Sequence, residues 1–333
     1  MNRVRSVLVV CLVLWASPAL AWWDAGHKII AAIAFRRLTP EQQQSVVTIL
    51  QAHPRWRVDF VEWLPDTLSE ADPQAQAKWF FLQASVWPDL ARDFEESAKA
   101  EFHHATWHYV NRPLYFSDRD RLSLAGRLTV NSSVTPPMEA EEGMNIAQTL
   151  LVARRLVSDP NTPAATRAVL LAWQFHLVGD SHQPMHAASL FSPRLFPEGC
   201  RGGNSIRTRP RENLHAAWDS LLGERISYRK AHQEAVRLMA DEELKAAGEQ
   251  AALTLDPLVW LRESHDLAES VAYGPEVLAP LRAAERTDGD VPVIALSEDY
   301  LSAAGRIARR RAVESGYRLG ALLQQMTAPP AAR

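Results

Sequence analysis

One stretch of the sequence, FHLVGDSHQPMH at residues 175–186, combines histidine and carboxylate side chains at spacings suited to binding a metal ion. His176 and Asp180 are four residues apart, so on a helix they project from one face about one turn apart and could bind the same ion. Pro184 is expected to end that helix, which would free His186 to point elsewhere. The stretch therefore predicts a metal site at the end of a helix.

A second pair, His215 and Asp219, repeats the four-residue spacing. For either pair taken alone, a solvated ion pair on an exposed helix face is an equally good interpretation. Two such pairs in one chain, with His186 nearby, favour metal binding. Carboxylate oxygen combined with imidazole nitrogen, without thiolate, suits zinc in a catalytic site better than in a purely structural one. Cys200 is not expected to be a ligand.

Segments further upstream carry weaker signals. Asp89 follows a proline, where an aspartate is more often a helix N-cap, and His108 lies among aromatic residues, where a histidine is more often part of the core. Cleavage after residue 21 would leave a free amine on Trp22, five residues before His27. None of these segments identifies a ligand by itself.

The first 21 residues are typical of a secretory signal peptide, with Arg3 and Arg5 before an apolar run and small residues at the cleavage site. Their removal changes the formal net charge from −3 to −5, so no overall basic field is expected to attract nucleic acid or anionic membrane. No later stretch approaches the roughly 20 apolar residues of a transmembrane helix. Cys200 is the one cysteine of the mature chain, which excludes an intrachain disulfide. We expect an exported protein, secreted or periplasmic, without a stable membrane anchor.

Helical patterns dominate the elements that must position these residues, and a composition of 47% hydrophobic and 23% charged residues excludes disordered and low-complexity classes. Thr39 before Pro40 and Thr162 before Pro163 predict helix starts, and Ser297 predicts the start of a long C-terminal helix. Further helices are expected over residues 26–37, 144–157, 213–222, 228–247 and 257–272. Less regular structure is expected over residues 53–79, 111–140, 187–212 and 274–295. We therefore expect a single all-α domain over residues 22–327 and a disordered tail over residues 328–333.

In chain order, five motifs resemble those of the zinc-dependent, single-strand-specific nucleases of the nuclease S-one/P-one family, within the superfamily that contains zinc-dependent phospholipase C. The motifs are Trp-x-x-x-Gly-His at 22–27, Asp-x-x-Arg at 89–92, His-aromatic-x-Asn at 108–111, His-x-x-Gly-Asp-x-His-Gln-Pro-x-His at 176–186, and Gly-Gly-Asn followed by Asn-Leu-His-x-x-Trp-Asp over 202–219. The resemblance implies the family's all-α fold, with long active-site loops.

The resemblance also implies a site with three zinc ions. The first ion would be bound by Asp89, His108, His176 and Asp180. The second would be bound by His186, His215 and Asp219. The third would be bound by the amine and carbonyl of Trp22 with His27, and would share Asp180 with the first. Removal of the leader would then have a chemical role, because an uncleaved chain has an amide where a free amine must coordinate.

Three more residues take roles from the resemblance. Arg92 would neutralise charge on the phosphate in the transition state. Tyr109 would stack on a base and Asn111 would contact it, which favours single strands because a duplex base cannot reach an aromatic face. Without the resemblance, Arg92 could be a surface arginine and Tyr109 a core residue. The arginines at 201, 207, 209 and 211 could follow a backbone phosphate, but a charge run of this kind is usually a solvated loop, and they are left out of the site. The histidines at 103, 104 and 182 are assigned no role, although His182 could support a ligand.

The implied function is an exported zinc phosphodiesterase that hydrolyses single-stranded DNA and RNA to products with 5′-phosphate ends, with 3′-nucleotidase activity. Zinc ions bridged by a carboxylate, here Asp180, lower the pKa of a bound water towards ~7. A zinc-dependent phospholipase C is the first alternative, because that relative uses nearly the same ligands on a different phosphodiester. A non-catalytic exported protein that uses zinc to stabilise its fold is the second.

Overall fold

A computed structural model describes residues 22–70 and 72–327, so the predicted signal peptide and the predicted disordered tail lie outside the described residues. The α-helices are α1 Asp24–Arg36, α2 Pro40–Leu50, α3 Asp66–Ser69, α4 Pro73–Leu90, α5 Glu96–Phe102, α6 Asp118–Leu124, α7 Ile146–Ser158, α8 Ala164–Asp180, α9 Leu214–Asp219, α10 Tyr228–Met239, α11 Glu242–Ala251, α12 Pro257–Leu267, α13 Pro275–Arg286 and α14 Glu298–Thr327. The strands are β1 Arg112–Tyr115, β2 Ala188–Phe191, β3 Thr208–Arg209 and β4 Ile294–Ala295. Shorter 3₁₀ or π turns lie at Trp56–Val61, Ala91–Asp93, Ala105–His108, Pro184–His186, Ser220–Leu222 and Ala268–Ala272.

Two of the three predicted helix starts are found with their caps. Thr39 accepts a hydrogen bond from the backbone N–H of Gln42, whose side chain accepts one in return, and α2 begins at Pro40. The hydroxyl of Ser297 accepts from the backbone N–H of Tyr300 at the start of α14. The cap assigned to Thr162 is wrong, because α8 starts at Ala164 and makes no side-chain cap hydrogen bond.

Several predicted boundaries are also wrong. The window 228–247 forms two helices, because the side chain of Asp241 accepts hydrogen bonds from the backbone N–H groups of Glu243 and Leu244 and caps α11. The window 257–272, predicted as one helix, forms α12 followed by a π turn. The supposedly less regular stretches contain α3, the start of α4, β1 with α6, and all of α13. Asp89 lies in the last turn of α4, so it is not an N-cap.

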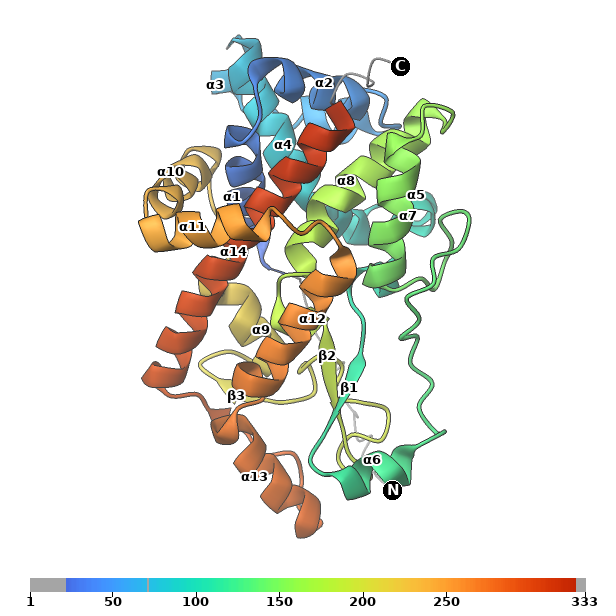
Figure 1. Cartoon of the computed structure of the whole chain (residues 1–333), viewed down its shortest axis with the longest axis vertical. Helices are drawn as coiled ribbons and strands as arrows, with labels where there is room; N and C mark the ends of the chain where they lie inside the picture. Colours follow the sequence, from blue (N-terminus) through green and yellow to red (C-terminus); the bar gives the residue numbers. More distant parts are fainter. Residues whose placement is uncertain (1–21, 71, 328–333) are drawn as a thin grey trace, which may run out of the picture.

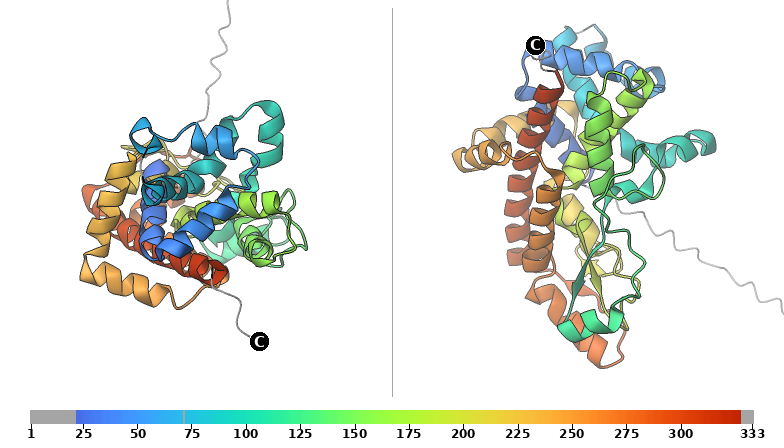
Figure 2. Two further views of the ribbon diagram at one scale, coloured as in Figure 1. Left: turned by 90° about the horizontal axis from the view of Figure 1, so that it is seen from above. Right: turned by 45° about the vertical axis from the view of Figure 1, so that its right-hand side comes forward.

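The helices pack around α1, α4, α8 and α14. The long helix α14 contacts α1, α8 and α11, and α1 also packs against α4 and α10 (Figures 1 and 2). Trp87 and Trp173 are buried in the core between these helices. Because α8 runs through this core and ends at Asp180, its last turn is held on a rigid scaffold.

Two short parallel strand pairs organise the other end of the molecule. β1 pairs with β2, aligning Leu114 with Leu190, and β3 pairs with β4. With α6 and α13 they form the lower part of Figure 1, around a second, smaller core that includes Trp218 and Tyr273. The end of α8 and the turn at 184–186 connect the two cores, which places the histidines of both predicted pairs at the junction.

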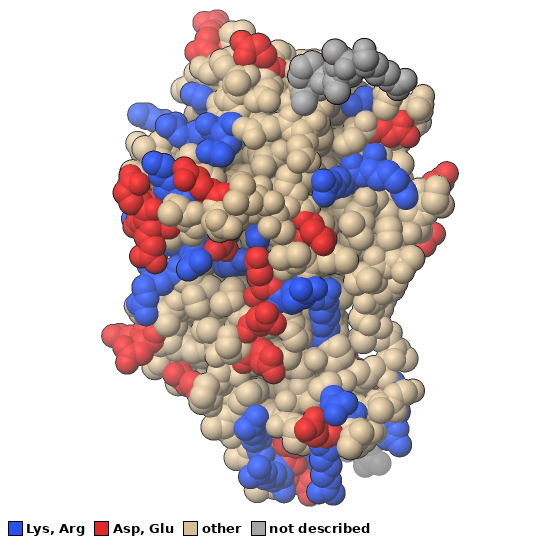
Figure 3. All heavy atoms as spheres, in the orientation of Figure 1, with Lys and Arg blue, Asp and Glu red and all other residues tan. Residues whose placement is uncertain are grey.

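The surface charges agree with a nearly balanced composition. On the face shown in Figure 3, acidic and basic side chains are interspersed and no single sign dominates. None of the described helices has the length and apolar character needed to cross a bilayer.

Candidate metal centre and substrate cavity

The last turn of α8 presents His176 and Asp180 on one face, as their spacing predicts. Both side chains are fully buried, and His176 Nε2 lies 3.3 Å from Asp180 Oδ2. The other ring nitrogen of His176, Nδ1, donates to the carbonyl of Ser85 on α4 at 2.8 Å. That hydrogen bond fixes the ring orientation and leaves Nε2 directed at Asp180, which is the arrangement found for histidines that bind metals.

The N-terminal motif lies against this turn because two glycines allow close approach. His27 stacks on His176 with ring centroids 3.9 Å apart, and its Nε2 lies 3.3 Å from Asp180 Oδ1. A Cβ on Gly179 would lie 2.8 Å from His27 Nδ1, too close for any side chain. In the same way, a Cβ on Gly26 would lie 2.7 Å from the Cβ of Trp22.

Trp22 is fully buried, and its indole N–H donates to the carbonyl of Gly179 at 3.1 Å. The residue is therefore anchored beside His27 and Asp180. The amine assigned to the third ion forms a peptide bond with residue 21, which lies outside the described residues. Ligation by that amine stays a prediction.

Two segments distant in sequence complete the first group. His108 ends the 3₁₀ turn 105–108, and its Nδ1 lies 3.1 Å from both Asp180 Oδ2 and His176 Nε2. Asp89 approaches His176 Nε2 to 3.8 Å from the end of α4. Four residues from three separate segments thus surround one small volume.

A second group forms where α9 meets the turn 184–186. His215 and Asp219 lie on one face of α9, with His215 Nε2 3.4 Å from Asp219 Oδ2 and 3.1 Å from His186 Nε2. The remaining nitrogens, both Nδ1, donate at 2.7 Å to the carbonyls of His108 and Gly202. Both rings therefore direct Nε2 inward, at the same point.

His and Asp side chains form three groups, and within each group the ligand atoms lie within 4.8 Å of one another. They are His27–His176–Asp180, Asp89–His108–His176 and His186–His215–Asp219. Several nitrogen and oxygen atoms of these residues are buried without a hydrogen-bond partner: both ring nitrogens of His27, His108 Nε2, Asp180 Oδ1 and Asp219 Oδ2. Buried polar atoms are normally paired, so this concentration of unpaired ligand atoms fits bound cations. The mixture of imidazole and carboxylate suits zinc.

The charge of Asp180 in the first group also favours a cation, whereas burial keeps Asp219 and His215 of the second group uncharged. Burial opposes ionisation of Asp180, but the neighbouring histidines, His176 first, hold its pKa well below the usual range. Burial likewise opposes protonation of His176, yet Asp180 and Asp89 raise its pKa to about 9. In the second group, burial raises the pKa of Asp219 well above its usual value, and burial and His186 lower the pKa of His215 to about 3.

A cavity of about 400 Å³ lies beside these groups, and three of their histidines, His108, His186 and His215, line it. The residues predicted to bind substrate, Arg92, Tyr109 and Asn111, line the same cavity. Arg92 Nη2 donates to Asp89 Oδ1 at 3.1 Å, which ties the guanidinium to the metal centre. The structure therefore brings the predicted phosphate-binding arginine and the predicted base-binding pair together beside the metal-binding residues.

The comparisons with known proteins agree with this arrangement. The sequence profile of the family described as S1/P1 Nuclease matches residues 22–328. The chain belongs to the S1/P1 nuclease family. Endonuclease 4 of Arabidopsis thaliana is 28% identical over 161 residues, which cover 45% of this chain and 48% of the plant protein. The match thus spans about half the length of that relative. Membership of this family of hydrolytic nucleases confirms the predicted resemblance, and the mostly helical single domain confirms the predicted fold class.

Sequence reasoning missed three residues of this S1/P1 nuclease site. The side-chain amide of Gln183 donates to Asp219 Oδ1 at 2.6 Å and so orients that carboxylate. Lys99 and Arg201 line the cavity beside Arg92. The position of Arg201 directly before the Gly-Gly-Asn motif was the available signal, but a run of exposed arginines is usually solvated.

The three histidines without a predicted role differ in position. His103 lines the cavity. His104 stacks on Trp107 instead, with its Nδ1 2.8 Å from Glu142. His182 points away from the metal centre: its Nε2 accepts from Arg318 at 2.8 Å, and burial with the nearby arginines holds its pKa well below the usual value.

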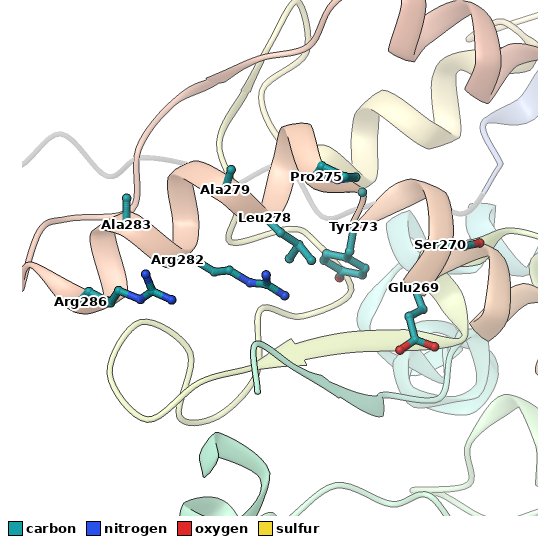
Figure 4. Close-up of a pocket in the computed structure, with 10 residues that line it drawn as sticks. Glu269, Ser270, Tyr273, Pro275, Leu278, Ala279, Arg282, Ala283 and Arg286 are labelled. Atoms are coloured by element: carbon teal, nitrogen blue, oxygen red, sulfur yellow. The ribbon is translucent and has the colours of Figure 1, made fainter. Parts of the chain in front are cut away.

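A larger cavity, of about 510 Å³, lies elsewhere in this S1/P1 nuclease, against α13. Figure 4 shows Arg282 and Arg286 projecting from that helix, with Tyr273 and Glu269 nearby. No His/Asp group of the described residues lies there. Size alone therefore does not identify the catalytic cavity.

Proposed function

We propose that this chain is a zinc phosphodiesterase that hydrolyses single-stranded DNA and RNA and leaves 5′-phosphate ends. The observation that carries the proposal is that three histidines of the buried His/Asp groups, His108, His186 and His215, line one cavity together with Arg92, Tyr109 and Asn111. Removal of a 3′-terminal phosphate, a 3′-nucleotidase activity, would use the same groups. We further propose that the protein is exported and acts after cleavage before Trp22.

The protein's residues have separate tasks in this proposal. Asp89, His108, His176 and Asp180 would hold one zinc ion, and His186, His215 and Asp219 a second. Trp22 and His27 would hold a third together with Asp180. When bound, zinc ions supply an activated water and take up negative charge on the attacking and leaving oxygens.

Arg92 is positioned to bind a phosphate oxygen. One of its five N–H donors is used by Asp89, and the guanidinium lines the cavity, so the other donors can reach a substrate. Its planar, permanently charged group would stabilise the charge that develops on the phosphoryl oxygens. No protein nucleophile is required, because water is the attacking group.

Tyr109 and Asn111 provide the proposed selectivity for single strands. Tyr109 is half-buried and offers its ring to the cavity, and Asn111 offers both a donor and an acceptor two residues later. A base must leave a duplex stack to reach them, whereas a base of a single strand is free to do so.

The test is cleavage of a single-stranded oligonucleotide and of the matching duplex by zinc-loaded protein that begins at Trp22, with product ends identified by mass spectrometry. We expect faster cleavage of the single strand, 5′-phosphate ends, and loss of activity on chelation. Ends carrying 3′-phosphates, or equal rates on both substrates, would contradict the proposal. No cleavage by fully loaded protein would favour phospholipids as the substrate class.

A further inference from the structure

Two basic side chains of the cavity have no task in the proposed reaction. Lys99 and Arg201 line the same cavity of about 400 Å³ as Arg92, Tyr109 and Asn111. Arg92 is paired with Asp89, but among the ion pairs of residues 22–70 and 72–327 none includes Lys99 or Arg201. The chain as a whole has a formal net charge of −3. Two cations without an ion-pair partner in one cavity of such a protein therefore indicate a site for an anion.

The backbone around Arg201 is held in an uncommon conformation. Its φ is +54°, in the left-handed region that non-glycine residues rarely adopt. The surrounding turn maintains it: the carbonyl of Arg201 accepts from the side-chain amide of Asn204 at 2.7 Å, and the buried thiol of Cys200 lies 3.1 Å from the hydroxyl of Tyr273. Such outliers cluster at functional sites, where the surrounding structure enforces them.

The same turn links Arg201 to the metal centre. The carbonyl of Gly202, the next residue, accepts from Nδ1 of His215 at 2.7 Å. A Cβ on Gly202 would lie 2.5 Å from the carbonyl oxygen of Met185, so the turn packs directly against the segment that carries His186. Arg201 is therefore fixed relative to the second His/Asp group.

Lys99 reaches the cavity from a separate element, the helix α5. It lies on α5, which is anchored by the buried side chains of Ala98 and Phe102. Lys99 is half-buried, and His103 lies beside it on the cavity wall. Lys99 lies close enough to His103 that, after burial and Arg92, its charge lowers the pKa of that histidine.

We propose that Lys99 and Arg201 bind the phosphate on the 5′ side of the nucleotide whose base contacts Tyr109 and Asn111. The inference rests on the proposed function and names its substrate class more closely. In a strand, each nucleoside carries a phosphate on both sides. If Arg92 and the metal centre bind the phosphate that is cleaved, on the 3′ side, the second phosphate of the same nucleotide needs its own cations, and the cavity holds two.

The consequence is a preference for internal phosphodiester bonds. A bond whose upstream nucleotide carries a 5′-phosphate gains the two contacts, whereas a bond next to a free 5′-hydroxyl does not. The chain should therefore bind pApA more tightly than ApA, although the cleaved bond is the same in both.

The experiment compares KM for ApA and pApA with the zinc-loaded protein that begins at Trp22. We expect KM about tenfold lower for pApA, as two charge-assisted contacts allow. In Lys99→Ala and in Arg201→Gln the preference should fall to about threefold, and in the double variant it should vanish. Arg207→Ala removes an exposed arginine from the same loop, outside the cavity, and should keep the tenfold preference.

Salt dependence provides a readout that a folding defect would not give. For a single-stranded oligonucleotide, each lost phosphate contact should reduce the slope of log KM against log salt by roughly 0.7. Equal KM for ApA and pApA in the wild-type protein would overturn the inference while leaving the nuclease proposal intact. So would variants in which KM rises equally for both dinucleotides. Failure of the wild-type protein to cleave either dinucleotide or an oligonucleotide would instead refute the proposed function, and the inference with it.

Discussion

Replacing Asp180 by Asn removes the carboxylate on which the metal centre depends most. Its two oxygens lie 3.3 Å from His27 Nε2, 3.1 Å from His108 Nδ1 and 3.3 Å from His176 Nε2. Among the carboxylates of the described residues, Asp180 alone lies within 4 Å of both a ring nitrogen of His27 and one of His108. The amide of Asn preserves the shape but removes the charge and one of the two oxygens that could bind an ion.

The size of the effect follows from the pKa of His176. Asp180 and Asp89 raise that pKa from 6.5 to about 9 against the effect of burial, which corresponds to about 3 kcal/mol of attraction for one positive charge. A divalent ion in the same place carries twice the charge. Because two carboxylates share this attraction while the ion carries twice the charge, loss of Asp180 should weaken binding of each adjacent ion by about 3 kcal/mol, a factor of more than about 100 in Kd.

The assay is the zinc content of the protein after equilibration in a zinc-buffering chelator. We expect three ions in the wild-type protein and one in Asp180→Asn, bound by His186, His215 and Asp219, with loss of nuclease activity. Asp219→Asn is the matched control and should lose only that one ion. Full zinc content and a wild-type rate in Asp180→Asn would refute the assignment of this carboxylate to two ions.

Four further predictions concern single features. Gly179→Ala should displace His27 and remove one ion, with a net loss of stability of about 1–2 kcal/mol because the clash outweighs the gain in helix propensity; an unchanged zinc content would contradict it. Tyr109→Ala should raise KM for an oligonucleotide without changing zinc content, and unchanged kinetics would remove Tyr109 from the site. One extra residue before Trp22 should cost one zinc ion, measured by elemental analysis, and an unimpaired ion count would exclude the amine as a ligand. Burial and Arg55 lower the pKa of His53 from 6.5 to about 3, so below pH 6.5 the unfolded chain binds a proton that the folded protein does not. The free energy of unfolding should therefore decrease as the pH falls from 6.5 towards 3. At pH 5 the loss is about 2 kcal/mol, and urea unfolding of metal-free protein at pH 7.5 and 5 should show a smaller loss in His53→Asn.

Local spacing predicts part of the site because part of it is local. His176 and Asp180 share a helix face, as do His215 and Asp219, and both pairs follow from the helical repeat. Asp89 and His108 come from other segments, and only tertiary packing brings them to Asp180. Viewed by themselves they are ordinary cap and core residues, so the resemblance to a family, not the local pattern, identified them.

The fold class could be predicted from the sequence, but the positions at which some helices end could not. Capping residues at the starts of α2 and α14 are strong local signals. The break between α10 and α11 depends on Asp241, one of many aspartates that could cap a helix. Lys99 carried no signal in the sequence, and Arg201 carried only its position before the Gly-Gly-Asn motif, because their shared cavity exists only when α5 and the turn at 200–204 are folded.

The measurement that tests the central claim most directly is a zinc titration of metal-free protein that begins at Trp22, with bound zinc and cleavage of a single-stranded oligonucleotide followed in the same samples. We predict no cleavage without metal, activity that rises as the zinc content approaches three ions per chain, and 5′-phosphate products throughout. Cleavage by the metal-free protein at the same rate, or no cleavage at three bound ions, would contradict the account.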